Sequence, residues 1–136
     1  MEKGNTNTKA YVYFIYESDS LGKFKIGRSV NPERRLKNLQ TGNSRLLQIY
    51  KTIECPSKNF AKYLEGALHL HYLSSCQGGE WFLLTVKEIE KILIVVAHLI
   101  KNDIPVDLFE EVWNLQFLKK EVRTIPFFPV FNSSAV

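Results

Sequence analysis

The chain has 136 residues, of which 45% are hydrophobic and 24% charged, as in a single compact globular domain. Its formal net charge of +4 is compatible with a polyanionic partner but does not require one. The longest apolar run, 92–97, is too short to span a membrane, and the polar N-terminus is not a secretory signal. Cys55 and Cys76 form no CxxC pair, which favours free thiols in a reducing compartment. We therefore expect an intracellular, cytoplasmic protein that is not embedded in a membrane.

Residue patterns predict an alternation of strands and helices. An aromatic and β-branched run favours a strand over residues 11–16. Turn residues at 17–22 separate it from a second strand at 23–27, so the two strands form a hairpin. The later predicted elements are a helix from 32 to near 41, a strand over 46–53, a helix over 58–73, a loop at 77–79, a strand over 81–84, a helix over 86–101 and a last helix from 105 to near 119.

Two of the predicted helices begin with capping signals. Asn31 precedes Pro32; Asn caps a helix, and Pro at the first helical position has no N–H to lose. Thr85 is followed three residues later by Glu88, which resembles a capping box. The helix after Thr85 is apolar nearly all round at 92–97, so we expect it to be largely buried.

This order of elements predicts a small α+β domain whose short mixed or antiparallel sheet is flanked by helices. We divide the chain into a disordered leader at 1–9, a domain at 10–101 and a C-terminal helical extension at 102–136. The apolar tail at 125–131 contains two prolines and three phenylalanines and cannot continue a helix. We expect the extension to pack on the domain or on a partner, and a homodimer formed through it is one candidate assembly.

Two strand residues are candidates for proton transfer. Tyr13 lies on the first predicted strand, and Lys25 lies on the second, on the sheet face opposite to Phe24 and Ile26. A packing tyrosine and a solvated lysine are the simpler interpretations of each residue alone. Paired strands can place both on one face, and an ammonium beside a phenol favours the phenolate, which makes Tyr13 a candidate base.

The first predicted helix begins with basic residues. Arg34 and Arg35 point about 100° apart on a helix, so at most one of them faces a given site. Arg28 and Arg35 together can clamp a phosphate, although solvated charges are the usual interpretation of such residues. Sequence-independent phosphate contacts are expected from Lys23, Arg28, Arg34, Lys37 and Arg45.

The second predicted helix carries a carboxylate in its most apolar stretch. Glu65 lies within 63–68, and a carboxylate in such surroundings is unusual unless it is paired. Mg²⁺ takes one or two carboxylates together with substrate phosphate oxygens, so Glu65 is a candidate ligand. His69 shares its helix face, but a Glu and a His are too few for a closed transition-metal site. His69 and Glu80 are secondary candidates for the site.

Taken in order, these motifs resemble the GIY-YIG nuclease superfamily over residues 10–84, and are closest to its compact phage and viral branch. The two motifs that name the superfamily fall on Tyr11–Tyr13 and Lys25–Gly27. The family's catalytic arginine, eight residues after the last glycine, falls on Arg35, and its metal-binding glutamate falls on Glu65. The later signature of the branch falls on His69, Tyr72 and the corner Gly79-Glu80-Trp81-Phe82.

The chain departs from the family pattern at four places. Tyr11 replaces the first glycine, and Lys25 replaces the second tyrosine, as it does in some GIY-YIG restriction enzymes. Cys76 stands where the viral branch often has a basic residue. The asparagine that many relatives carry after the metal-binding glutamate is not evident, and Glu80 lies near its place.

The resemblance implies a metal-dependent DNA endonuclease that hydrolyses phosphodiester bonds with a single Mg²⁺ or Mn²⁺ bound to Glu65. It implies that Arg35 stabilises charge on the phosphate, and that Tyr13, its pKa lowered by Lys25, accepts a proton from the attacking water. A phage- or virus-infected cell is the expected setting. The alternatives are a catalytically inactive module of the same fold that binds nucleic acid or protein, and an interaction protein whose apolar tail docks on a partner.

Overall fold

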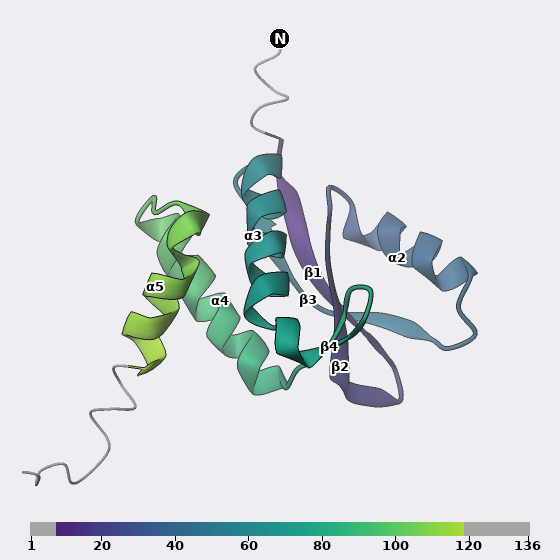
Figure 1. Cartoon of the computed structure of the whole chain (residues 1–136). Coiled ribbons are helices and arrows are strands. Elements are labelled where there is room, and N and C mark those ends of the chain that lie inside the picture. The colour runs from purple at the N-terminus through teal and green to yellow at the C-terminus, as the bar shows by residue number, and fades with distance from the viewer. Residues whose placement is uncertain (1–7, 119–136) are drawn as a thin grey trace, which may run out of the picture.

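The computed structural model describes residues 8–118, which form a five-stranded sheet flanked by helices (Figure 1). The strands are β1 (Ala10–Glu17), β2 (Ser20–Ser29), β3 (Leu47–Cys55), β4 (Cys76–Gly78) and β5 (Trp81–Leu83). The helices are α2 (Pro32–Thr41), α3 (Lys58–His71), α4 (Val86–Lys101) and α5 (Phe109–Trp113). Single turns of helix are η1 (Leu73–Ser75), η2 (Val106–Leu108) and the π-helical η3 (Asn114–Leu118). The domain is therefore α+β, as the sequence predicts.

All pairings within the described sheet are antiparallel, in the order β3-β1-β2-β5-β4. β1 lies between β2 and β3 and pairs with both along most of its length. β5 is much shorter, and the residues of β2 with which it pairs are only Lys23, Phe24 and Lys25. In the described part of the chain, the edge of β2 beyond Lys25 therefore has no strand partner on that side, and side chains of other elements can reach it.

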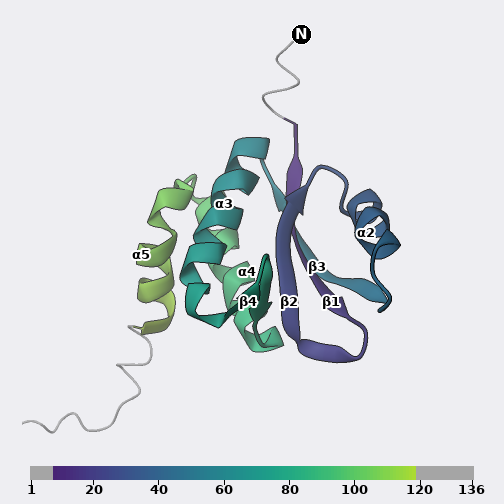
Figure 2. The ribbon, with the colours of Figure 1, turned by 45° about the vertical axis from the view of Figure 1, so that its right-hand side comes forward.

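Alternation along the strands gives the sheet two unlike faces. Val12 and Phe14 of β1 point to one face and join α3, α4 and α5 in the main hydrophobic core. Tyr13 and Ile15 point to the other face, where Leu36 and other apolar residues of α2 and the neighbouring strands pack against them. Figure 2 shows α2 on one side of the sheet and α3, α4 and α5 on the other. No residue of α2 is buried, so the second face is only thinly covered.

The helix α4 is less buried than its composition predicts. One stripe, which includes Ile92 and Val95, faces the main core and is fully buried. Ile94, on the opposite side, keeps 51% of its surface exposed, and Ala97 is exposed as well. The expectation of a largely buried helix at 92–97 is wrong in this respect, because α4 packs against the rest of the described domain with one face only.

Both hairpin turns are tighter than the sequence predicts. β1 and β2 are joined by two residues, so pairing extends to Glu17 and Ser20 where a turn over 17–22 was expected. The predicted loop at 77–79 includes part of β4, which pairs with β5. Gly78 (φ 117°) and Gly79 (φ 58°) adopt positive φ values, which let the chain reverse within a short turn and leave the preceding residues free to pair.

The described part of the C-terminal extension packs on the domain. Phe109 and Val112 are buried in the main core, beside α3 and α4. His71 Nδ1 lies 2.7 Å from the Glu110 carboxylate, and the His71 ring packs on Trp113 with 4.4 Å between ring centres. The predicted leader residues 1–7, the helix end beyond 118 and the apolar tail at 125–131 lie outside the described residues.

Both cysteines are free, in line with the expectation from their spacing. Cys55 is fully buried in the main core, and this burial raises the pKa of its thiol to about 11. Cys76 at the start of β4 is partly exposed. Within residues 8–118, no helix is both long and apolar enough to cross a membrane.

Candidate active site

Five polar side chains from five separate segments line one pocket of about 240 Å³. The residues are Tyr13, Arg28, Arg35, Glu65 and Glu80. They come, in that order, from β1, β2, α2, α3 and the turn that leads into β5. The pocket thus unites three of the four residues to which the sequence resemblance assigns a catalytic role. The fourth, Lys25, reaches the pocket through Glu80, whose carboxylate lies 3.6 Å from its ammonium.

Tyr13 is fixed by its partner in the sheet. It lies directly opposite Gly27 in the β1–β2 ladder, and its side chain is almost completely buried. A Cβ atom at position 27 would overlap the hydroxyl and the ring of Tyr13. Gly27 is therefore needed because the tyrosine side chain crosses closely over its backbone.

Arg35 is the cation that donates a hydrogen bond to Tyr13. Burial raises the pKa of the Tyr13 hydroxyl above its ordinary value, while a hydrogen bond from Arg35 and its positive charge oppose this rise. Lys25 lies opposite Ile15, two residues along the ladder and on the same face as Tyr13, and its ammonium lies 3.6 Å from the Glu80 carboxylate, so its effect on this pKa stays a prediction. The negative charges of Glu80 and Glu65 add to the rise in the pKa of Tyr13.

Glu65 is a buried carboxylate with a partner, as its apolar surroundings indicate. Its exposed fraction is 8%, and Leu64 and Leu68 beside it on α3 face the main core. Arg28 of β2 donates a hydrogen bond through Nη1 to Oε1 of Glu65. From the sequence, Arg28 is expected among the general phosphate contacts and, with Arg35, as a phosphate clamp; both arginines line the pocket, where Arg28 pairs with Glu65.

His69 connects α3 to the open edge of β2. Its Nε2 atom lies 2.8 Å from the backbone oxygen of Ile26 and 3.9 Å from Oε2 of Glu65. A carbonyl oxygen can only accept a hydrogen bond, so Nε2 carries the proton and has no lone pair for a metal. The ring also packs on Phe82, with 4.9 Å between ring centres. His69 therefore anchors α3 to β2 and is not a ligand through this nitrogen.

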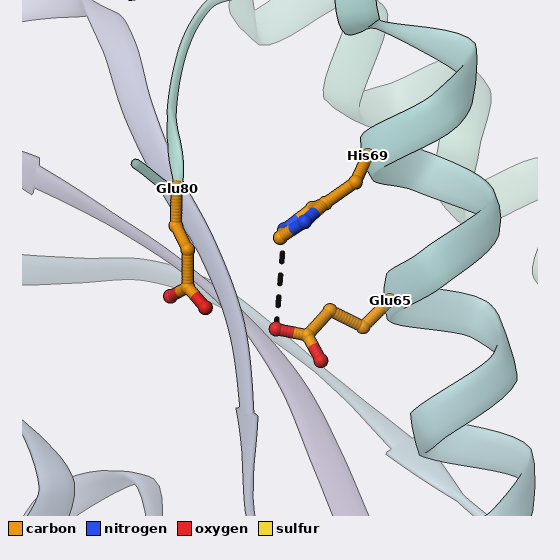
Figure 3. A group of neighbouring side chains, drawn as sticks. All are labelled: Glu65, His69 and Glu80. Carbon is orange, nitrogen blue, oxygen red and sulfur yellow. Dashed lines mark ion pairs between the residues drawn. The ribbon is translucent and has the colours of Figure 1, made fainter. Parts of the chain in front are cut away.

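The two carboxylates suit a hard divalent cation. Glu65, His69 and Glu80 offer ligand atoms that lie within 4.8 Å of one another, and Figure 3 shows their side chains converging from α3 and from the turn before β5. The backbone oxygen of Glu80 accepts a hydrogen bond of 3.0 Å from Ile26, which fixes this turn to β2. Carboxylate oxygens are the donors that Mg²⁺ and Mn²⁺ prefer. With His69 Nε2 bonded to Ile26, Glu65 and Glu80 are the residues that fit such an ion.

The other basic residues singled out from the sequence lie outside the pocket. Arg34 and Lys37 are exposed on α2, and the ammonium of Lys23 lies 5.5 Å from the ring centre of Trp81. Arg45 pairs with Asp19 at 3.0 Å and with Glu17 at 3.8 Å. The charge of Arg45 is thus already balanced by carboxylates, which weakens it as a phosphate contact.

Comparison with known proteins places the domain in a family. No curated protein and no solved structure matches the chain. The family model of the T5orf172 domain matches residues 10–97, well over half of the chain. The match includes every residue of the polar pocket and ends before the C-terminal extension. The chain therefore belongs to the T5orf172 domain family, a phage-associated domain linked to homing-endonuclease-like and GIY-YIG-type nucleases.

Proposed function

We propose that the protein is a metal-dependent endonuclease that hydrolyses phosphodiester bonds in DNA. The observation that carries the proposal is the pocket that gathers one phenol, two guanidinium groups and two carboxylates. Membership of the T5orf172 family supports a nuclease-like or DNA-binding function. The net charge of +4 suits a polyanionic substrate.

In this proposal, Arg35 and Tyr13 act together on the scissile phosphate. Arg35 donates hydrogen bonds to the phosphate and stabilises the negative charge that builds up when water attacks. As water attacks the phosphorus, the P–O bond to the leaving oxygen breaks and that oxygen takes a proton from solvent. The phenolate form of Tyr13 accepts the proton of the attacking water, and the positive charge of Arg35 favours this form against the effect of burial. Glu65 and Glu80 would hold a divalent cation, which would supply Lewis-acid polarisation of a phosphate oxygen.

The ion pair between Arg28 and Glu65 favours a second candidate function. An arginine that permanently neutralises Glu65 removes the negative charge that a divalent cation needs. The domain would then be a catalytically inactive module that binds nucleic acid through its basic groups. In the active enzyme, Arg28 instead exchanges the carboxylate for the substrate phosphate, which its side chain, 46% exposed, has room to do.

Cleavage assays on purified protein separate the two candidates. Plasmid and branched DNA are incubated with Mg²⁺, Mn²⁺ or EDTA, and we expect nicked or linear products with the metals only. Glu65→Gln should abolish cleavage and leave the circular dichroism spectrum and DNA affinity unchanged, because glutamine keeps the shape but not the charge. Glu54→Gln, at an exposed glutamate paired with Lys9, is the matched control and should cut like the wild type.

Three outcomes of this assay decide between the candidates. Cleavage by Glu65→Gln at the wild-type rate would exclude Glu65 as the metal ligand. DNA binding by the wild-type protein without cleavage under any metal condition would support the binding module. Loss of cleavage in Glu65→Gln alone, with Glu54→Gln active, would support the nuclease.

A further inference from the structure

A second pocket, of about 220 Å³, lies next to the candidate active site. Three cationic side chains, those of Arg28, Lys58 and Lys62, line it together with the polar residues Ser29 and Asn59. Arg28 lines both pockets, so they share a wall. Among residues 8–118, no carboxylate lines the second pocket, in contrast to the first. This basic pocket is formed by the end of β2 and the first turns of α3.

The two lysines of the basic pocket have unbalanced charges. In the part of the chain that the structure describes, neither Lys58 nor Lys62 forms an ion pair, whereas Lys9 and Lys25 each lie beside a carboxylate. Both lysines are exposed at the N-terminal end of α3, where the helix dipole adds to the positive potential. The pocket therefore presents a concave basic surface that attracts an anion.

The register of α3 aligns these lysines with the candidate active site. Lys58, Lys62 and Glu65 follow one another at spacings of four and three residues, so they share one face of the helix. At about 1.5 Å per residue, Lys62 lies roughly 4.5 Å and Lys58 roughly 10.5 Å along the axis from Glu65. Phosphates of one DNA strand follow one another every 3.4 Å or so along the duplex axis. A strand held at Glu65 thus passes both lysines within a few nucleotides.

We propose that the basic pocket is a second phosphate subsite, which binds the backbone of the cleaved DNA strand beside the scissile phosphate. The inference rests on the proposed function and adds a direction to it: the strand runs along α3 towards the N-terminal end of that helix. Lys58 and Lys62 neutralise the flanking phosphates. Ser29 Oγ accepts a 2.9 Å hydrogen bond from the backbone of Asn31, so its own hydrogen is free to be donated to a phosphate oxygen.

The test measures DNA binding separately from cleavage. Protein carrying Glu65→Gln is titrated with a fluorescent DNA duplex in EDTA over a series of salt concentrations. A plot of log affinity against log salt has a negative slope, to which each phosphate contact contributes about 0.9. In this background, Lys58→Ala with Lys62→Ala should therefore reduce the magnitude of the slope by about 1.8. Lys58→Arg with Lys62→Arg keeps both charges and should retain the slope.

The matched control removes the same charge from another surface. Lys87 and Lys101 are exposed residues of α4, outside both pockets, and replacing both by alanine should change the slope far less. Equal slopes for the two alanine pairs would overturn the subsite, whatever the cleavage assay shows. If the magnitude of the slope decreases only for the pocket pair and the wild-type protein cuts no DNA, the subsite is upheld and the proposed catalysis is rejected.

Discussion

The two faces of the sheet are covered very differently, and one of them holds most of the apolar core. On one face, side chains such as Phe14 and Phe24 join three helices in a continuous apolar core. On the other face, the buried cluster in the described residues consists of Tyr13, Ile15 and Leu47, beneath a helix that has no buried residue. The first face provides most of the burial that stabilises the fold.

The polar pocket takes side chains from both faces of the sheet. Two carboxylates, a phenol and two guanidinium groups would lose much hydration free energy deep in the main core, where few polar partners are available. Tyr13 and Arg35 lie on the thinly covered face. Arg28 of β2 and Glu65 of α3 meet them from the other side at the open end of β2. Apart from Pro32 and two leucines, the side chains of α2 are polar or charged, and the helix presents Arg35 to the pocket. The protein thus places its polar pocket at the open end of β2, where groups from both faces of the sheet meet.

Truncating one apolar residue on each face of the sheet should give the largest difference in the free energy of unfolding. Phe14 is fully buried, so Phe14→Ala should lower the free energy of unfolding by about 3–5 kcal/mol through lost burial and the cavity that remains. Leu39 of α2 is only partly buried, and Leu39→Ala should cost about 1 kcal/mol. Urea denaturation followed by circular dichroism measures both values. Equal losses would contradict the unequal roles of the two faces.

Removing the arginines of α2 should affect chemistry and leave stability nearly unchanged. Arg35→Ala should lower the single-turnover cleavage rate by ~10²–10³, the usual effect of losing one donor to developing charge. Arg34 is exposed outside the pocket, so Arg34→Ala should mainly weaken DNA affinity and its salt dependence. Rapid-quench kinetics at saturating protein compares the two variants. A rate loss of the same size in both would remove the special role of Arg35.

Two buried tyrosines report on the electrostatics of the two faces. Tyr72, in the main core, donates a 2.7 Å hydrogen bond to Glu88, and burial together with this carboxylate raises its pKa strongly. The pKa of Tyr13 is also raised by burial, but Arg35 opposes the rise. On alkaline titration, Tyr13 should therefore ionise before Tyr72. Phenolate absorbance of Tyr13→Phe and Tyr72→Phe variants identifies each transition.

The same titration tests which cation acts on Tyr13. Arg35→Ala should move the Tyr13 transition to higher pH, whereas Lys25→Met should leave it in place. Because the folded-state pKa values of Tyr13 and Tyr72 lie above the unfolded value of about 10, the stability linked to each phenol is complete below that pH. It is lost as the pH rises through the folded-state pKa. A shift with Lys25→Met as large as that with Arg35→Ala would restore the role assigned to Lys25 from the sequence.

Removing the caps of two helices should have the smallest effect on stability, and only one of the two caps should also affect cleavage. Asn31→Ala and Thr85→Ala each remove a 3.1 Å hydrogen bond to a backbone N–H and should each cost about 1 kcal/mol of stability. Only Asn31→Ala should also slow cleavage, because α2 has little else to hold it and Arg35 lies in its first turn. Thermal unfolding and single-turnover rates, measured on both variants, check this; slower cleavage by Thr85→Ala would contradict it.

The sequence by itself determined the features that depend on near neighbours. Asn31 and Thr85 cap their helices as predicted, because a cap involves residues only three positions apart. The α+β order of elements followed from periodicity and turn residues. Strand alternation put Lys25 on the face opposite to Phe24 and Ile26, as their burial shows. That Glu65 is paired also had a local signal, since a carboxylate among apolar helix residues needs a partner.

The tertiary structure alone decided which groups meet in the pocket. Arg28 and Glu65 are 37 residues apart, and they pair because the short β5 leaves the end of β2 open to α3. The same opening gives His69 the carbonyl of Ile26 and so occupies its Nε2 nitrogen. Arg35 takes the place beside Tyr13 that the sequence assigned to Lys25, because α2 covers that face of the sheet. Residue patterns extend over one helical turn or one strand pleat, whereas these contacts depend on how whole elements pack, which no short pattern encodes.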